Sequence, residues 1–137
     1  MTSTVVYNGD LRTTCTHLRS GDYFETDAPV DNNGKGERFS PTDLMATSLA
    51  TCMITVMGIK ARSMGFDLNE IKIGVEKIMK ADPRRVGGIN LFFNIPASLE
   101  SIDDKSKAIL KKTGETCPVI QSIHPDIELK IDWEKWG

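Results

Sequence analysis

The chain has 137 residues, of which 39% are hydrophobic and 26% are charged. These values are typical of one globular domain with a real hydrophobic core, and they argue against a disordered chain. The formal net charge of −2 gives no electrostatic reason for a nucleic-acid partner, so we expect none.

The N-terminal part of the chain predicts an antiparallel β-meander over residues 4–27. Short β-branched runs alternate there with turn signals such as Asn8-Gly9-Asp10 and Ser20-Gly21-Asp22. The meander has few large apolar residues, so we expect another surface to cover it, and a second copy of the chain is the simplest candidate. The predicted strands are residues 4–8, 11–18 and 23–26.

Residues 41–64 predict one long central helix. Ser40 suits the N-cap, Pro41 the first helical position, and Asp43 completes a pattern like a capping box. Apolar residues lie on nearly every face through Ile59, which predicts a helix that is buried all round. Thr, Ser and Gly interrupt this run, so we expect it to fall short of a membrane span.

The first residues show neither a basic segment nor an apolar run of signal-peptide length, and we expect a cytoplasmic protein. The remainder of the chain, residues 69–134, predicts strands and short helices. The order of strands, helix, strands, helices and strand indicates an α+β fold with an antiparallel sheet, organised as a single domain over residues 1–137. The predicted elements are strands 69–80, 89–95 and 127–133 and helices 101–113 and 119–122, with Pro83-Arg84-Arg85 and Gly87-Gly88 as the turn between the first two strands.

Three cysteines carry the strongest chemical signal. Cys52 lies in the middle of the central helix, where a thiol often only fills space. Cys117 precedes Pro118 at the start of a predicted short helix, where free N–H groups and the helix dipole favour a thiolate. Cys15, on a predicted strand, is expected to be inert. If Cys52 and Cys117 meet, they form a redox centre in which one thiol attacks an oxidant and the other resolves the sulfenic acid.

Other polar residues give weaker signals. Arg12 and Arg38 could lower the pKa of a thiol, although most arginines are solvated. His17 and His124 are more simply packed or helix-terminating residues than ligands. The chain has no CxxC motif and no Cys/His cluster with zinc spacing, so we expect no metal site.

Two separate motifs resemble the OsmC/Ohr family of osmotically induced and organic-hydroperoxide-resistance proteins. The first is Ser40-Pro41-x-Asp43-Leu44, with Cys52 in the helix that follows. The second is Cys117-Pro118-Val119 with Ser122-Ile123-His124-Pro125. The order of elements also fits that family over essentially the whole chain.

This resemblance implies an intertwined homodimer in which antiparallel sheets surround two long central helices. It implies two active sites at the dimer interface, in which the Cys52 thiol is the peroxidatic nucleophile and Cys117 resolves it as a disulfide. It further implies organic hydroperoxide substrates, reduction by dithiols such as lipoyl groups, and no metal or bound organic cofactor.

The chain departs from the best-understood members at one position. These carry an acidic residue ten positions before the first cysteine, which holds an arginine over the thiolate. That position is Thr42 here, whereas Asp43 stands nine positions before Cys52, as in an OsmC-like branch of the family. Arg12 and Arg38 are the candidates for the arginine. The alternative function is therefore an OsmC-like small-molecule-binding, lipid-binding or stress protein without significant peroxidase activity.

Overall fold

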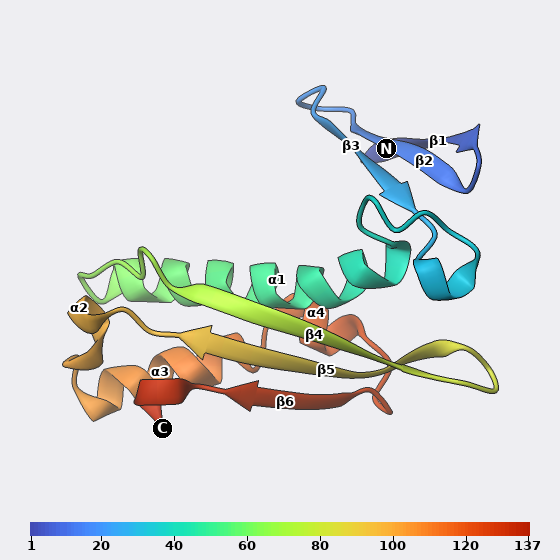
Figure 1. Cartoon of the computed structure of the whole chain (residues 1–137). Helices are drawn as coiled ribbons and strands as arrows, with labels where there is room; N and C mark the ends of the chain where they lie inside the picture. Colours follow the sequence, from blue (N-terminus) through green and yellow to red (C-terminus); the bar gives the residue numbers. More distant parts are fainter. The chain divides into compact units, whose positions relative to one another are not determined.

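A computed structural model describes residues 1–137 (Figure 1). The chain forms two compact units, Met1–Met45 and Ala46–Gly137. Helix α1 (Pro41–Ser63) begins in the first unit and continues in the second. The organisation of the whole chain as a single domain stays a prediction.

The first unit contains the predicted meander. Strands β1 (Ser3–Gly9), β2 (Arg12–His17) and β3 (Tyr23–Asp27) form an antiparallel sheet in that order. Gly9, Asp10 and Leu11 have positive φ values of 83°, 51° and 61°, which is the geometry of the tight hairpin turns in which Asn, Asp and Gly are common. The meander prediction is confirmed, and every strand end agrees to within one residue.

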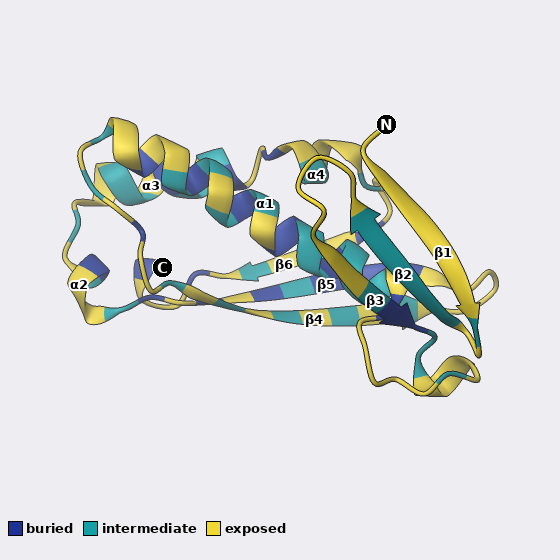
Figure 2. Ribbon diagram, turned by 90° about the horizontal axis from the view of Figure 1, so that it is seen from above, coloured by how far each residue is buried: buried dark blue, intermediate teal, exposed yellow.

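The three-stranded sheet leaves large apolar side chains in solvent. Val5, Val6 and Tyr7 are 64%, 58% and 64% exposed, although neighbouring residues of a strand point to opposite faces. Figure 2 shows β1 exposed along its length. Within this chain, therefore, neither face of the sheet is covered at β1. A 3-10 turn, η1 (Val30–Asn32), and a glycine-containing loop follow β3.

Helix α1 begins with the predicted capping box. The backbone N–H of Asp43 donates to Ser40 Oγ at 3.0 Å, and the backbone N–H of Ser40 donates to Asp43 Oδ2 at 2.9 Å. Both groups would otherwise lack an intrahelical partner. The helix ends near Gly65, which has a φ of 89°, and Phe66 N donates to Ala61 O at 3.1 Å as in a Schellman motif. The two ends are confirmed.

The prediction that α1 is buried on all faces is wrong for the single chain. Its buried residues follow one stripe, and exposed stretches alternate with them along the helix (Figure 2). Ile59 is 67% exposed. The expectation that the apolar run is too short to span a membrane is also wrong, because the length and composition of α1 would allow it to cross one. One such helix is weak evidence for a span, since core helices of soluble proteins meet the same criterion. The buried stripe is Ala46, Leu49, Ala50, Met53, Met57 and Ala61.

The second unit is built on a mixed sheet with the order β4-β5-β6. Strands β4 (Lys72–Lys80) and β5 (Arg85–Asn94) form an antiparallel hairpin, but β6 (Glu128–Asp132) runs parallel to β5. The α+β class with antiparallel-rich sheets is confirmed, and β6 adds one parallel strand to the second sheet. A parallel neighbour requires a crossover, and here helices α2 (Ala97–Glu100), α3 (Asp104–Gly114) and α4 (Pro118–Ser122) supply it.

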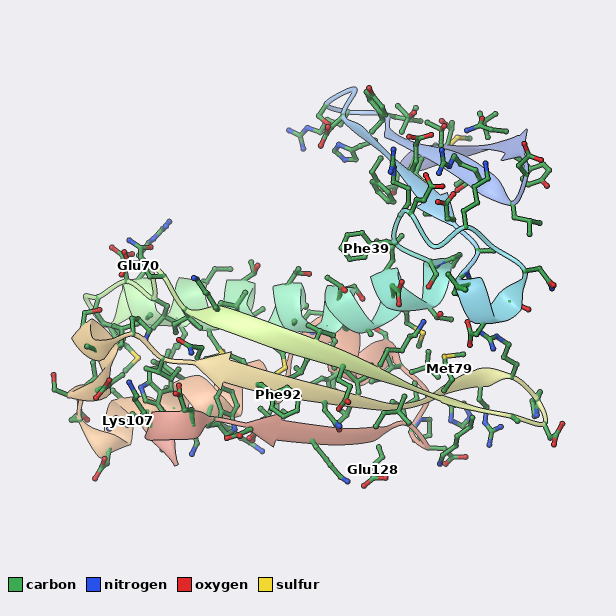
Figure 3. All side chains as sticks on the ribbon, viewed as in Figure 1. Phe39, Glu70, Met79, Phe92, Lys107 and Glu128 are labelled. Atoms are coloured by element: carbon green, nitrogen blue, oxygen red, sulfur yellow. The ribbon has the colours of Figure 1, made fainter.

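The helices α1, α3 and α4 lie on one side of this sheet (Figures 1 and 2). Strand alternation sends Ile89, Leu91 and Phe93 into the core, where each is at most 2% exposed. Phe93 stacks on Trp133 with ring centroids 4.3 Å apart. Phe92, which Figure 3 labels, projects from the opposite face and is 47% exposed.

Several predicted boundaries move. The turn between β4 and β5 lies at 81–84, and the pair Gly87-Gly88 belongs to β5, where both residues are buried. Helix α3 begins at Asp104 and not at Ser101, because Asp103 is its N-cap and accepts from Ser106 N at 2.9 Å. The chain closes with a 3-10 turn, η2 (Glu134–Trp136).

Candidate active site

Helix α1 carries Cys52 at the edge of its buried stripe. The side chain is partly exposed, whereas the next residue, Met53, is completely buried. Met57, one turn later, is also completely buried. Cys52 is therefore held on a well-packed helix while a part of its surface stays accessible.

Cys117 occupies the N-cap position of α4, and Pro118 takes the first helical position as predicted. Thr116, the residue before Cys117, donates its hydroxyl to Lys112 O at 3.0 Å and so does not cap α4. The backbone N–H of Cys117 donates to Gly114 O at 3.1 Å. The Cys117 side chain is only 1% exposed, so residues of this chain alone are enough to bury it.

The thiols of Cys52 and Cys117 lie close enough to hydrogen-bond to one another, and both belong to the second unit. Burial raises the pKa of the Cys117 thiol above its ordinary value, because a thiolate is poorly solvated there. The neighbouring Cys52 raises this pKa further, whereas the backbone N–H groups of Ile120 and Val119 lower it. The structure thus brings together the two cysteines that stand 65 residues apart in the sequence, one partly accessible and one buried.

The third cysteine, Cys15, lies on β2 in the first unit. Its Sγ is 3.9 Å from Thr13 Oγ1, and the register places it between Val5 and Phe24. These neighbours are uncharged, and the inertness of Cys15 stays a prediction.

Arg12 is held rigidly by a carboxylate that sequence reasoning did not single out. Arg12 Nε donates to Asp27 Oδ1 at 2.7 Å, and Arg12 Nη2 donates to Asp27 Oδ2 at 2.8 Å. Asp27 is 2% exposed and faces Arg12 across the β2–β3 register. Glu37 adds a longer contact of 3.4 Å to Arg12 Nη2. The Arg12 guanidinium lowers the pKa of the Asp27 carboxyl and so keeps it ionised.

Arg38, the other candidate arginine, is less constrained. Its Nε lies 3.6 Å from Glu25 Oε1, and its Nη1 donates to Glu37 O at 3.1 Å. The side chain is 47% exposed. The two arginines therefore differ, because Arg12 makes a bidentate pair with a buried acid and Arg38 makes a single, longer ion pair.

The remaining polar candidates have local partners. Asp43 forms the capping box with Ser40. His124 Nδ1 accepts from Asp126 N at 3.1 Å, and His17 Nδ1 lies 2.6 Å from Ser20 Oγ. No group of three or more His, Cys, Asp or Glu side chains is arranged to hold a metal ion.

Sequence comparison identifies the family. The pattern that defines the OsmC-like proteins matches residues 34–132, more than half of the chain. The chain belongs to the OsmC-like protein family. This match contains both Cys52 and Cys117, whereas Arg12 and Asp27 lie before it.

Solved structures of OsmC-like proteins share the fold. An osmotic stress induced and detoxification response protein from Psychrobacter arcticus 273-4 is 52% identical, with a TM-score of 0.90 over 96% of this chain and 94% of that one. The organic hydroperoxide resistance protein OsmC from Legionella pneumophila is 18% identical, with a TM-score of 0.71 over 96% of both chains. OhrB of Bacillus subtilis, an organic hydroperoxide resistance protein, is also 18% identical, with a TM-score of 0.62 over 96% of this chain and 97% of that one. No curated protein matches the chain.

Proposed function

We propose that the protein reduces organic hydroperoxides to alcohols by way of a Cys52 sulfenic acid and a Cys52–Cys117 disulfide. The observation that carries this proposal is the proximity of the two thiols within one compact unit. Membership of the OsmC-like family supports it, as do the names of the hydroperoxide resistance proteins that share the fold.

The proposed reaction cycle has three steps. The Cys52 thiolate attacks the distal oxygen of ROOH, the O–O bond breaks, and the alkoxide leaves as ROH after taking a proton. The Cys117 thiolate then attacks the Cys52 sulfenic sulfur and displaces hydroxide, which leaves as water. A dithiol of the lipoyl type reduces the disulfide by two thiol–disulfide exchanges and is itself oxidised to a cyclic disulfide.

The different environments of the two thiols support this division of roles. Cys52 is partly exposed and can meet a substrate, whereas Cys117 is 1% exposed and has the Cys52 thiol within hydrogen-bonding reach. Burial raises the pKa of the Cys117 thiol, which lowers its thiolate fraction and slows its own reaction with oxidants. A resolving thiol needs these properties, since its premature oxidation would block the disulfide.

Arg12 is the cation we assign to the stabilisation of the Cys52 thiolate, with Asp27 as the residue that orients it. The bidentate pair fixes the Arg12 guanidinium plane, which the looser contacts of Arg38 do not do. Asp43 contributes through the start of the helix that carries Cys52.

The active protein in this proposal is a cytoplasmic homodimer. Apolar side chains are exposed on the first unit, and contiguous exposed apolar surface marks an interaction site. They support a homodimer in which a second copy of the chain covers this surface. Analytical ultracentrifugation tests this part, and a monomer at micromolar concentration contradicts it. The exposed set includes Val5, Val6, Tyr7, Tyr23 and Phe24.

The decisive experiment measures hydroperoxide consumption with dihydrolipoamide as reductant. Wild type, Cys52→Ser, Cys117→Ser and the matched control Cys15→Ser are compared with cumene hydroperoxide and a fatty-acid hydroperoxide. Cys52→Ser should lose turnover, Cys117→Ser should retain one oxidation without forming the disulfide, and Cys15→Ser should equal wild type.

Failure of the proposal has a clear signature. If wild type consumes both hydroperoxides no faster than Cys52→Ser, the protein is not a peroxidase for this class of substrate. Ordinary thiol reactivity without a peroxide-induced Cys52–Cys117 bond would then favour the alternative, a small-molecule-binding or lipid-binding OsmC-like protein.

A further inference from the structure

Gly114 lies at the end of α3 close to two methionines of α1. It is the last residue of α3 and is buried. A Cβ atom at this position would lie 2.8 Å from Met57 Sδ, 3.2 Å from Met57 Cγ and 3.3 Å from Met53 Cε. The first distance is too short for a carbon–sulfur contact, and both methionines are completely buried, so neither can turn into solvent.

The same glycine is tied directly to Cys117. The Gly114 carbonyl accepts the backbone N–H of Cys117 at 3.1 Å. The residues between them are also bonded, because Glu115 N donates to Lys111 O and Thr116 N donates to Thr113 O. This short turn leads straight into the N-cap of α4, so a displacement of Gly114 carries Cys117 with it.

On α1, the residues that a Cβ atom at Gly114 would meet lie close in the sequence to the other thiol. Met53 follows Cys52 in the sequence, and Met57 lies one turn further along. The close approach at Gly114 and the meeting of the two thiols are therefore neighbouring contacts between the same two segments.

We infer that Gly114 is a positioning residue for the Cys52–Cys117 disulfide, because its missing side chain lets the end of α3 approach α1 closely enough for the two sulfurs to bond. The inference rests on the proposed function, since it concerns the resolving step. Disulfide geometry is narrow, with the Cβ atoms about 3.5–4.5 Å apart. A shift that a hydrogen bond between thiols would tolerate can therefore prevent the covalent bond.

The test compares Gly114→Ala with Gly58→Ala as a matched control. Gly58 is also helical, but a Cβ there would meet nothing within 4 Å. Each protein is equilibrated in glutathione redox buffers, where oxidised glutathione takes two electrons and two protons from the thiol pair and becomes two reduced molecules. The equilibrium gives the effective concentration of the two thiols, which measures how readily they form the disulfide. This effective concentration should fall at least tenfold in Gly114→Ala and stay within twofold of wild type in Gly58→Ala.

A second background isolates the contact with Met57. In Met57→Ala, which removes the Cγ and Sδ atoms, adding Gly114→Ala should change the effective concentration by less than twofold. If circular dichroism shows that Gly114→Ala alone does not fold, the comparison of Met57→Ala with the double variant Met57→Ala/Gly114→Ala still tests the inference. A full tenfold loss on adding Gly114→Ala to Met57→Ala, or no loss on adding it to wild type, overturns the inference.

The readouts separate this inference from the proposed function. Labelling of Cys52 sulfenic acid with dimedone, after one equivalent of cumene hydroperoxide, should be as strong in Gly114→Ala as in wild type. If wild type forms no Cys52–Cys117 disulfide in any redox buffer, the proposed resolving step fails. If wild type forms it and Gly114→Ala forms it equally well, only the role of Gly114 fails.

Discussion

Arg12 donates two hydrogen bonds to the carboxylate of Asp27, from Nε to Oδ1 at 2.7 Å and from Nη2 to Oδ2 at 2.8 Å. The same carboxylate accepts the backbone N–H of Glu37 at 3.2 Å, and the Asp27 backbone N–H donates to Phe39 O at 3.1 Å. One buried acid thus joins two strands of the meander and both ends of the loop that precedes α1.

Replacement of Asp27 by Asn should lower the Tm at pH 7 and should remove a pH dependence. Because the pKa of Asp27 is lowered in the folded chain, its stabilising effect is present above the pKa of an unfolded Asp, about 3.9, and is lost as the pH falls through the folded value. The difference in Tm between wild type and Asp27→Asn should therefore shrink from pH 6 towards pH 3.

Asp10→Asn is the matched control for this charge change, because Asp10 is exposed in the same unit. Thermal scans followed by circular dichroism at several pH values supply the measurement. A difference in Tm that stays constant down to pH 3 would show that the Asp27 carboxylate contributes nothing as an ionised group.

Loss of the helix cap should destabilise the protein. Ser40 is 1% exposed, and Ser40→Ala removes the acceptor for the Asp43 N–H, so we expect a loss of about 1 kcal/mol in the free energy of unfolding. Urea titration measures it. Ser101→Ala, at an exposed hydroxyl, should change the value by less than about 0.5 kcal/mol. Equal effects of the two substitutions would contradict the capping role.

The buried thiol should react slowly with alkylating agents. Burial keeps the reagent away from Cys117, and the raised pKa of this thiol lowers its thiolate fraction. Iodoacetamide at pH 7.5 should therefore modify Cys52 at least tenfold faster than Cys117. Peptide mass spectrometry after timed quenching gives the two rates. Modification of Cys117 at the same rate as Cys52 would remove the basis for assigning it the resolving role.

Two adjacent phenylalanines should have very different effects on stability. Phe93 is 2% exposed and stacks on Trp133, so Phe93→Ala should cost about 3–5 kcal/mol in the free energy of unfolding. Phe92 lies on the open face and is 47% exposed, so Phe92→Ala should cost less than about 1 kcal/mol. Chemical denaturation of both variants checks the sheet register, because a one-residue slip would exchange the two results.

Local chemistry predicted a large part of the fold. The Ser40–Asp43 capping box, the left-handed Gly65 and the Cys117-Pro118 helix start depend on neighbours in the sequence, and all three are observed. The strands of the meander followed for the same reason, because alternation and turn residues are local signals.

Features that depend on distant residues were missed. Alternation along Glu128–Asp132 identifies a strand but carries no information on its direction, so the parallel pairing with β5 could not be predicted. The partner of Arg12 depends on the β2–β3 register, which places Asp27 opposite it. Gly87-Gly88 looked like a turn because glycine is common in turns, yet both residues lie in β5.

The proximity of Cys52 and Cys117 was open on sequence grounds, because no spacing rule joins a helix centre to a helix start far along the chain. Family resemblance implied the pair, and the structure places the thiols together. The roles of Arg12, Arg38 and Asp43 in catalysis stay predictions.

The parallel placement of β6 has a consequence for biosynthesis. Because β6 follows Cys117 in the sequence and pairs with β5, the crossover that contains Cys117 is closed only when residues 128–132 are in place. Trp136 Nε1 donates to Leu99 O at 3.0 Å, and Lys111 Nζ donates to Gly137 O at 2.9 Å, so residues 136 and 137 hold both α2 and α3. A growing chain on the ribosome therefore exposes Cys52 well before its partner thiol is held in place, and the thiol pair is assembled only after residues 128–137 have been synthesised.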